Sequence, residues 1–377
     1  MKKLILFMVM SFLLIISACG DSNESTSNEG GQKEGTQDPI VLTSSFGATD
    51  QHFWYRGFLN VLMDEVEEGS NGEVRFERFT GGELVELGTE LEALNSNAID
   101  VALSLQAPYD PQRFPYTEVV MLPTLESDAG IITDAMVNLM QSDIEIKDGK
   151  TYNELEFTDK GLVAFPNPST EAYILSSTKK EFESVADFNQ SVRMRTASRI
   201  HEILADELNI TGQSMSITDS YDALSRGALD GIIYTASDWI AFGFDELIKH
   251  SITDVNFGHF VGYMALKQET WDTFSPETQQ LFEEKAYELV HEGAAITMEE
   301  MEENIASNEE KGGQLKSFND LDPELQKHLE EVIVLTWEKW IESLEKEGHA
   351  GKEIALLWRD LLVDAGAVLP DEILNLE

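Results

Sequence analysis

Residues 91–103 read LEALNSNAIDVAL, in which a short helix ends, an apolar–aspartate pair follows and an apolar strand begins. Residues 221–233 repeat this order as YDALSRGALDGII, 130 positions further along the chain. We interpret the two stretches as equivalent units in two similar α/β domains. Two unrelated helix–turn–strand pieces are the alternative.

The segments around both stretches alternate between strand and helix, as is typical of an α/β fold with a largely parallel sheet. Apolar or alternating runs predict strands at residues 39–46, 74–79, 101–105, 162–165, 172–175, 193–195, 214–217 and 261–266. Amphipathic runs predict helices from 50 to 68, from the break at Gly81-Gly82 to 97, and from 200 to 208.

Two long helices are expected towards the end of the chain. Ser275 is a serine N-cap followed by Pro276 at the first helical position, and Asp322 and Pro323 form the same start signal. Gly348 ends the second helix. The tryptophans of that helix lie on its apolar stripe, so we expect them to pack in the core.

The first 38 residues predict export and anchoring. Two lysines, an apolar run over 4–16 and two small residues form a signal peptide over residues 1–18. Residues 16–19, ISAC, resemble the lipobox of bacterial lipoproteins, so Cys19 is the expected lipidation site. Residues 19–38 would be a flexible tether, and the protein would be lipid-anchored at the extracellular face of the cell membrane. An ordinary secretory signal with an incidental cysteine is the alternative.

The composition excludes several classes of function. The chain has 70 acidic and 26 basic residues among 377, a net charge of −44, which repels nucleic acid and anionic membranes. A bound anion therefore needs a local cationic contact. Cys19 is the only cysteine, so no disulfide within the chain is expected. The acidity could also be an adaptation to high salt or alkaline pH.

No motif for catalysis is found. None of the seven histidines stands three or four residues from another, and no nucleophile elbow, P-loop or dinucleotide fingerprint occurs. We therefore expect no catalytic residue, no metal and no cofactor. His52, near the end of the first predicted strand, keeps an exported enzyme as an alternative.

Residues 187–198, DFNQSVRMRTAS, together with residues 221–231, resemble the signature of solute-binding proteins of TRAP (tripartite ATP-independent periplasmic) transporters, the dicarboxylate-binding type, here in a lipoprotein form. Gln190 and Ser191 replace the usual Lys-Gly, and one residue is inserted. Further similarity lies at residues 97–100, 121–123 and 267–271, so the resemblance covers roughly residues 39–365.

The resemblance implies a periplasmic-binding-protein-like fold, with two α/β domains, a ligand cleft between them and long C-terminal helices. Residues 39–170 plus 260–300 would form domain I, and residues 171–259 plus 301–365 domain II. The implied function is capture of an organic acid, which TRAP-type permease subunits take up on an ion gradient. A ligand sensor without a permease is a further alternative.

The resemblance assigns the ligand carboxylate to Arg195, and a guanidinium fork fits a carboxylate bidentately. A structural ion pair is the alternative role of Arg195. Arg193, on the same face of the strand, is the main competitor. Other ligand-binding candidates follow by their position after predicted strands or beside the arginine: Trp54, Gln106, Tyr109, Tyr173, Thr196, Tyr234, Asp238 and Trp239.

The range of expected ligands is narrowed by two positions at which this sequence departs from the family pattern. Members that bind sialic acid carry an arginine at about Tyr173 and an asparagine at about Tyr234. The two tyrosines argue against sialic acid and favour a less polar monocarboxylate, such as an aromatic, branched-chain or keto acid. A dicarboxylate is the alternative.

Overall fold

The computed structural model describes residues 38–377. The predicted signal peptide, Cys19 and the tether up to residue 37 lie outside the described residues. The strands are β1 (Ile40–Ser45), β2 (Val74–Phe79), β3 (Val101–Leu105), β4 (Leu162–Pro166), β5 (Tyr173–Ser177), β6 (Arg193–Thr196), β7 (Thr211–Ser214), β8 (Gly231–Thr235), β9 (His250–Thr253), β10 (Tyr263–Lys267) and β11 (Gln314–Ser317). The helices are α1 (Asn60–Gly69), α2 (Glu90–Asn95), α3 (Ala129–Met140), α4 (Tyr152–Glu156), α5 (Arg199–Glu207), α6 (Ile217–Ser225), α7 (Trp239–Phe242), α8 (Phe244–Leu247), α9 (Gln268–Trp271), α10 (Pro276–Glu310), α11 (Pro323–Lys346), α12 (Gly351–Ala365) and α13 (Asp371–Leu374).

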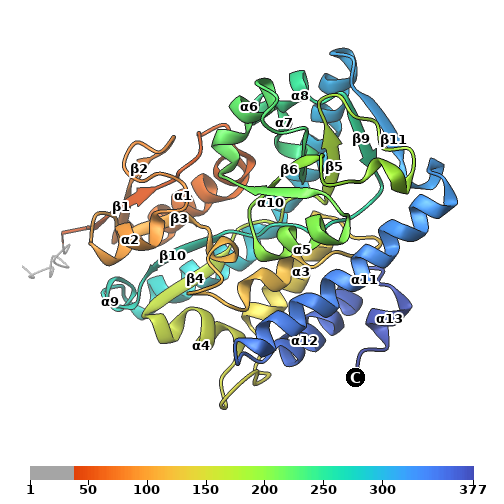
Figure 1. Ribbon diagram of the computed structural model, residues 1–377. Coiled ribbons are helices and arrows are strands. Elements are labelled where there is room, and N and C mark those ends of the chain that lie inside the picture. Colours follow the sequence, from red (N-terminus) through yellow and green to blue (C-terminus); the bar gives the residue numbers. More distant parts are fainter. Residues whose placement is uncertain (1–37) are drawn as a thin grey trace, which may run out of the picture. The chain divides into compact units, whose positions relative to one another are not determined.

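Two sheets organise these elements, and they lie apart in Figure 1. The first has the strand order β2-β1-β3-β10-β4 and the second the order β11-β9-β5-β8-β6-β7. We call the parts built on them the first and the second domain. The two-domain α/β fold expected from the sequence is confirmed, while the residue bounds given for the domains stay a prediction.

Each sheet contains a strand that arrives from the other domain. Strand β10 enters the first sheet antiparallel to β3 and β4, and β5 enters the second antiparallel to β8 and β9. The expectation of largely parallel sheets is therefore wrong; both are mixed. The reason is that these strands follow segments that cross between domains, whereas a parallel strand needs a crossover within its own domain.

The crossing segments run side by side. Between β4 and β5, the amides of Asn167 and Thr170 donate to the carbonyls of Gly262 and Phe260 at 2.8 and 3.0 Å. At the far end, the amide of Tyr173 donates to Gly258 at 2.8 Å. The two domains are thus joined by a hydrogen-bonded ribbon, which is the expected place for a hinge between them.

The repeated sequence units adopt the same structure. Asp100 precedes β3, where its carboxylate accepts from the amide of Thr43 at 2.8 Å. Asp230 precedes β8, where its carboxylate accepts from the amide of Arg193 at 2.9 Å. In each domain the aspartate accepts from a backbone amide of the neighbouring parallel strand, so the interpretation as equivalent units is confirmed.

The long helices begin as predicted. Ser275 accepts from the amide of Thr278 and Asp322 accepts from that of Glu324, which caps α10 and α11. Helix α10 packs against α1 and α3 of the first domain and against α8 of the second. Trp337 and Trp340 of α11 are fully buried, which confirms their core packing.

Three local predictions differ from the structure. The helix expected over 50–68 begins with a π-helical turn, Tyr55–Leu59, before α1. The helix expected over 81–97 is only α2, because Gly88 has a positive φ of 91° and the preceding residues form a loop. The strand expected at 214–217 holds the end of β7 and the serine that caps α6. No helix among residues 38–377 has the length and apolarity needed to cross a membrane.

Candidate functional site

A cavity of about 450 Å³ lies between the two domains. It is lined by Phe46, Ala48, His52, Trp54, Leu87, Gly88, Gln106, Tyr109, Asp110, Arg113, Thr170, Tyr173, Arg195, Ala197, Ser214, Met215, Ser216, Ile217, Tyr234, Asp238, Phe242 and Phe260. Both sheets contribute through the loops after their strands, and so do the crossing segments. Its size suits a small organic molecule.

Arg195 lies on β6 at the wall of the cavity and is only 1% exposed. Its Nε donates to the carbonyl of Met215 at 3.1 Å, which fixes the side chain. Neither terminal nitrogen donates to a described residue, and Nη1 is fully buried. Because an unpaired buried charge costs several kcal/mol, the guanidinium is suited to hold an anion.

The structure distinguishes between the two roles considered for Arg195, a contact to the ligand and a structural ion pair. Arg195 forms no ion pair with any carboxylate of residues 38–377. Arg193, the competitor, is tied to Asp230: Nε and Nη2 donate to its two carboxylate oxygens at 3.0 Å each. Arg193 is not among the residues that line the cavity.

Three tyrosines surround the guanidinium. The rings of Tyr109 and Tyr234 lie 5.9 and 5.7 Å from its central carbon, a cation–π distance. The hydroxyl of Tyr109 lies 3.3 Å from that of Tyr173, which links the first domain to the second. Burial raises the pKa of Tyr173 and of Tyr234 well above 10, so both remain neutral.

His201 lies behind this wall. Its ring stacks on Tyr173 with 5.3 Å between centroids, and it is fully buried. Burial, with a smaller effect of the Arg195 charge, lowers the pKa of His201 to about 3. The histidine is therefore neutral, and Arg195 is the cationic group of this part of the cavity.

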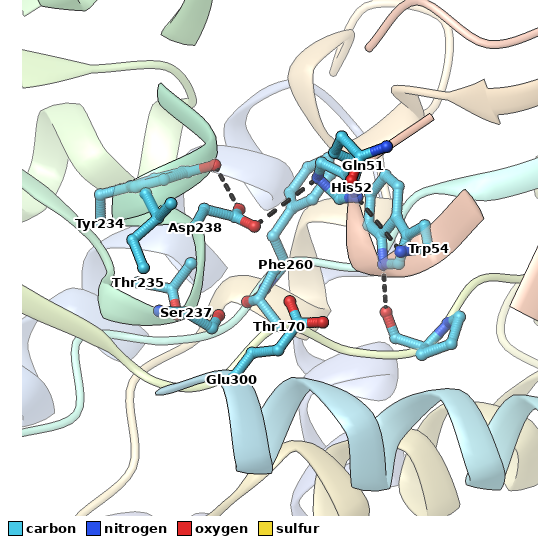
Figure 2. Close-up of polar contacts among 12 residues, drawn as sticks. Gln51, His52, Trp54, Thr170, Tyr234, Thr235, Ser237, Asp238, Phe260 and Glu300 are labelled. Carbon is cyan, nitrogen blue, oxygen red and sulfur yellow. Dashed lines mark hydrogen bonds and ion pairs between the residues drawn. The ribbon is translucent and has the colours of Figure 1, made fainter. Parts of the chain in front are cut away.

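Tyr234, Asp238 and His52 form a polar group at the cavity (Figure 2). The Tyr234 hydroxyl donates to Asp238 Oδ2 at 2.6 Å, and Asp238 Oδ1 lies 3.7 Å from His52 Nε2. His52 Nδ1 accepts from the amide of Trp54 at 3.2 Å. Burial lowers the pKa of His52, partly offset by Asp238, so its ring is neutral with the proton on Nε2.

Trp54 and Gln106 complete the first-domain wall. The indole Nε1 of Trp54 donates to the carbonyl of Pro168 at 2.7 Å, in a crossing segment. A side chain at Gly262 would put its Cβ 2.8 Å from the Trp54 ring, so this glycine allows the close approach. Gln106 follows β3 and lines the cavity.

Seven of the nine predicted ligand residues thus line one cavity, and their role in binding stays a prediction. Thr196 and Trp239 are not among the lining residues, although both are buried. Thr196 follows Arg195 on β6, so its side chain points to the opposite face, where its methyl packs against Gly212. Trp239 begins α7 and is fully buried.

Sequence reasoning missed several lining residues. Arg113 is a second cation at the cavity, but it pairs with Asp110 and, at 2.6 Å, with Glu92. The spacing of Asp110 and Arg113 was the available signal, since residues three apart meet in a turn. Arg199 forms an ion pair with the buried Glu118 at 3.1 Å. No group of three metal-ligating side chains is found among the described residues.

Residues 45–343 match the family model DctP, described as bacterial extracellular solute-binding protein, family 7. A curated relative is the C4-dicarboxylate-binding periplasmic protein DctP of Rhodobacter capsulatus. It is 24% identical over 298 residues, which cover 77% of this chain and 83% of the relative.

Solved structures share the fold. A TRAP solute binding protein from a marine metagenome, specific for aromatic acid ligands and in complex with 3-hydroxybenzoate, has a TM-score of 0.76 at 18% identity, covering 88% of this chain and 100% of that one. A TRAP periplasmic solute binding protein of Bordetella bronchiseptica with bound mandelate has a TM-score of 0.73 at 18% identity, covering 86% and 99%. One from Rhodoferax ferrireducens, with copurified benzoate, has a TM-score of 0.74 at 16% identity, covering 86% and 98%.

Proposed function

The chain belongs to family 7 of the bacterial extracellular solute-binding proteins, and we propose that its cavity captures an organic acid for uptake by a TRAP-type permease, driven by an ion gradient. The observation that carries the proposal is Arg195, a buried guanidinium whose terminal nitrogens have no partner among residues 38–377. A ligand carboxylate would accept from both of them and neutralise the buried charge.

One carboxylate is favoured over two. Arg195 is buried and unpaired, whereas Arg113 already pairs with two carboxylates and is partly exposed. A second ligand carboxylate would also approach Asp238. The walls are tyrosine and phenylalanine rings, which favour an aromatic acid. This assignment follows the neighbours that hold benzoate, mandelate or 3-hydroxybenzoate, and departs from the C4-dicarboxylate named for the Rhodobacter relative.

Capture would work by closure of the two domains. The Tyr109–Tyr173 contact and the pair of His52 with Asp238 both join the first domain to the second beside the cavity. A ligand held by Arg195 that also touches Tyr109 stabilises the closed state, because it contacts both domains only there. The hydrogen-bonded crossing segments would serve as the hinge.

The same site gives no support to catalysis. His52 is the only histidine among the described lining residues, its Nδ1 is taken by a backbone amide, and its Nε2 faces Asp238. No serine or threonine hydroxyl of residues 38–377 bonds to its ring. We therefore propose a binding protein without a catalytic step and without a cofactor.

The N-terminal sequence is the basis for the proposed location of the protein. Cleavage before Cys19 and acylation of its thiol would anchor the protein outside the cell membrane, near its permease. The test is fractionation of cells that express the full chain. We expect the wild type in the membrane fraction and Cys19→Ser in a soluble fraction; equal partitioning of the two would contradict the anchor.

Calorimetric titration of the protein with organic acids tests the capture itself. We expect at least one aromatic monocarboxylate to bind at micromolar or lower concentration, and Arg195→Ala to weaken it at least ~100-fold, since the carboxylate loses both of its charged bonds. Arg193→Ala is the matched control and should bind as the wild type does. Equal affinity of wild type and Arg195→Ala would refute the role of Arg195.

A further inference from the structure

The cavity has a second polar position, besides Arg195, that a carboxylate does not explain. It consists of Asp238 Oδ1 and His52 Nε2, which lie 3.7 Å apart. This distance is too long for a hydrogen bond between them. Within residues 38–377 neither atom has another hydrogen-bond partner, although Asp238 and His52 are only 2% and 8% exposed. Neither atom is among the fully buried ones, and both residues line the cavity, so a ligand group can reach the pair.

The pair offers one acceptor and one donor. Asp238 Oδ2 is occupied by the Tyr234 hydroxyl, which leaves Oδ1 to accept. His52 Nδ1 is occupied by the Trp54 amide, which leaves Nε2–H to donate. An oxygen placed about 2.8 Å from each atom fits across the gap and can make both bonds at a normal distance.

A hydroxyl matches this pair better than other substituents. It donates to Asp238 and accepts from His52 with the same oxygen. An ammonium has no lone pair for the His52 proton, and a second carboxylate would face the charge of Asp238. An ether can accept from His52 but leaves Asp238 without a donor.

Tyr234 lies next to both polar positions of the site. Its ring faces the guanidinium of Arg195 at 5.7 Å, and its hydroxyl reaches Asp238 at 2.6 Å. The same tyrosine therefore contacts both the guanidinium that would hold the carboxylate and the aspartate that would accept from the hydroxyl. The intervening walls are aromatic, with Tyr109 stacked on Phe260 at 4.5 Å.

We propose that the ligand is an aromatic monocarboxylate with a hydroxyl on its ring, which donates to Asp238 Oδ1 and accepts from His52 Nε2. This inference rests on the proposed function, since it assumes that the carboxylate binds Arg195. Asp238 and His52 would then determine specificity, with one residue from each domain, so that the hydroxyl also favours the closed state.

The test measures a ratio of affinities. Benzoate, 3-hydroxybenzoate and 4-hydroxybenzoate are titrated calorimetrically, with the two methoxybenzoates as analogues that lack the donor. We expect one hydroxybenzoate to bind ~10–100-fold more tightly than benzoate, as for a hydrogen bond to a charged group, and its methoxy analogue to lose this advantage. Benzene-1,3-dicarboxylate should bind more weakly than benzoate.

Asp238→Asn tests whether the higher affinity for a hydroxybenzoate arises at Asp238. It keeps the shape but removes the charge, so the ratio of hydroxybenzoate to benzoate affinity should fall about 10-fold while benzoate affinity changes less. Asp50→Asn, in the loop before His52 but not at the cavity, should leave the ratio unchanged. Because the readout is a ratio, a general loss of folded protein cancels.

Three outcomes would overturn the proposal. Neither hydroxybenzoate binds more tightly than benzoate; the methoxy analogue keeps the advantage; or Asp238→Asn weakens hydroxybenzoate and benzoate by the same factor. If benzoate binds in an Arg195-dependent way while any of these holds, the hydroxyl assignment fails and the proposed function stands. If no acid of the series binds, both fail.

Discussion

The start of β6 in the second domain matches in register the second half of β1 in the first. Asp100 binds the amide of Thr43 and Asp230 binds that of Arg193, and β3 and β8 then pair with the next residues of their neighbours. In this register Arg195 pairs opposite Ile232 and Ser45 opposite Ala102, so Ser45 holds the position that Arg195 holds in the other domain.

The difference between these positions assigns roles to the domains. Ser45 is 1% exposed and its hydroxyl has no partner among the described residues, but it carries no charge. The second domain therefore supplies the buried cation that has no carboxylate partner, while the first supplies His52, Trp54, Tyr109 and the already paired Arg113. The two equivalent units thus carry a charged residue, Arg195, in one domain and a neutral residue, Ser45, in the other. This difference fits a ligand with a single carboxylate.

The largest expected effect comes from changing the two arginines of β6 in the same way. Arg195→Lys keeps the charge but loses the planar fork, so we expect affinity for the acid to fall about 100-fold, or about 2.7 kcal/mol. Arg193→Lys should change affinity less than about twofold, because Arg193 contacts Asp230 and not the cavity. Titration calorimetry measures both. Equal losses in the two variants would remove the distinction between these arginines.

The second effect concerns stability as a function of pH, to which titratable groups of the two domains contribute differently. The first domain buries Glu90, Glu118 and Glu156, and burial raises their pKa values to about 7, 7 and 8, with Arg199 partly offsetting the shift at Glu118. In the second domain, burial lowers the pKa of His201 to about 3. The acids are thus harder to ionise in the folded state, and the histidine is harder to protonate.

The two kinds of group act in different pH ranges. Between pH 6.5 and 8 the folded state binds more protons than the unfolded state at the three glutamates, so stability should fall as pH rises, by about 3 kcal/mol. Below the unfolded pKa of about 6.5, the unfolded state takes up a proton at His201, so stability is lost as pH falls there.

Glu156→Gln tests the assignment by chemical denaturation at several pH values. Glu156 has the highest of the three pKa values and is fully buried, so the glutamine should remove about half of the loss between pH 6.5 and 8. Glu145→Gln, an exposed control in the same domain, should leave the slope unchanged. A wild type whose stability rises over this range would contradict the interpretation.

A feature could be predicted from the sequence where the residues that form it lie close together in the chain. The repeated unit was predictable because its helix end, turn and aspartate lie within thirteen consecutive residues of each copy. Arg195 was identified through its place on a strand and the family resemblance. Its separation from Arg193 needed the structure, because both point to the same face and only the position of Asp230 decides between them.

Features made by residues distant in the chain could not be predicted. The bond of Tyr234 to Asp238 is local, but the approach of His52 to Asp238 depends on how the two domains meet. Thr196 was included because it adjoins Arg195, although alternation along a strand turns it away. The antiparallel entry of β5 and β10 followed from the crossing segments, which leave no periodic signal in the sequence.

A smaller effect is expected from the two aspartates. Asp100→Ala removes one bond to a backbone amide and should cost about 1 kcal/mol of folding free energy. Asp230→Ala removes the same bond and the pair with Arg193, whose partly exposed groups add less than about 1 kcal/mol. In an Arg193→Ala background the cost of Asp230→Ala should fall to that of Asp100→Ala. If Asp100→Ala proves the more costly of the two, the equivalence of the units is energetically wrong.

The smallest effect concerns the turn before each aspartate. Asn97 and Gly227 hold matching positions with positive φ values of 57° and 70°. A Cβ at Gly227 would meet no atom within 4 Å, so Gly227→Ala tests backbone strain alone and should cost about 1 kcal/mol. Gly227→Asn installs the residue of the other copy and should cost about half as much, because asparagine tolerates this conformation. Urea denaturation resolves the two variants. If alanine costs no more than asparagine at this site, the two turns differ in what they require, and the equivalence extends only to the aspartates.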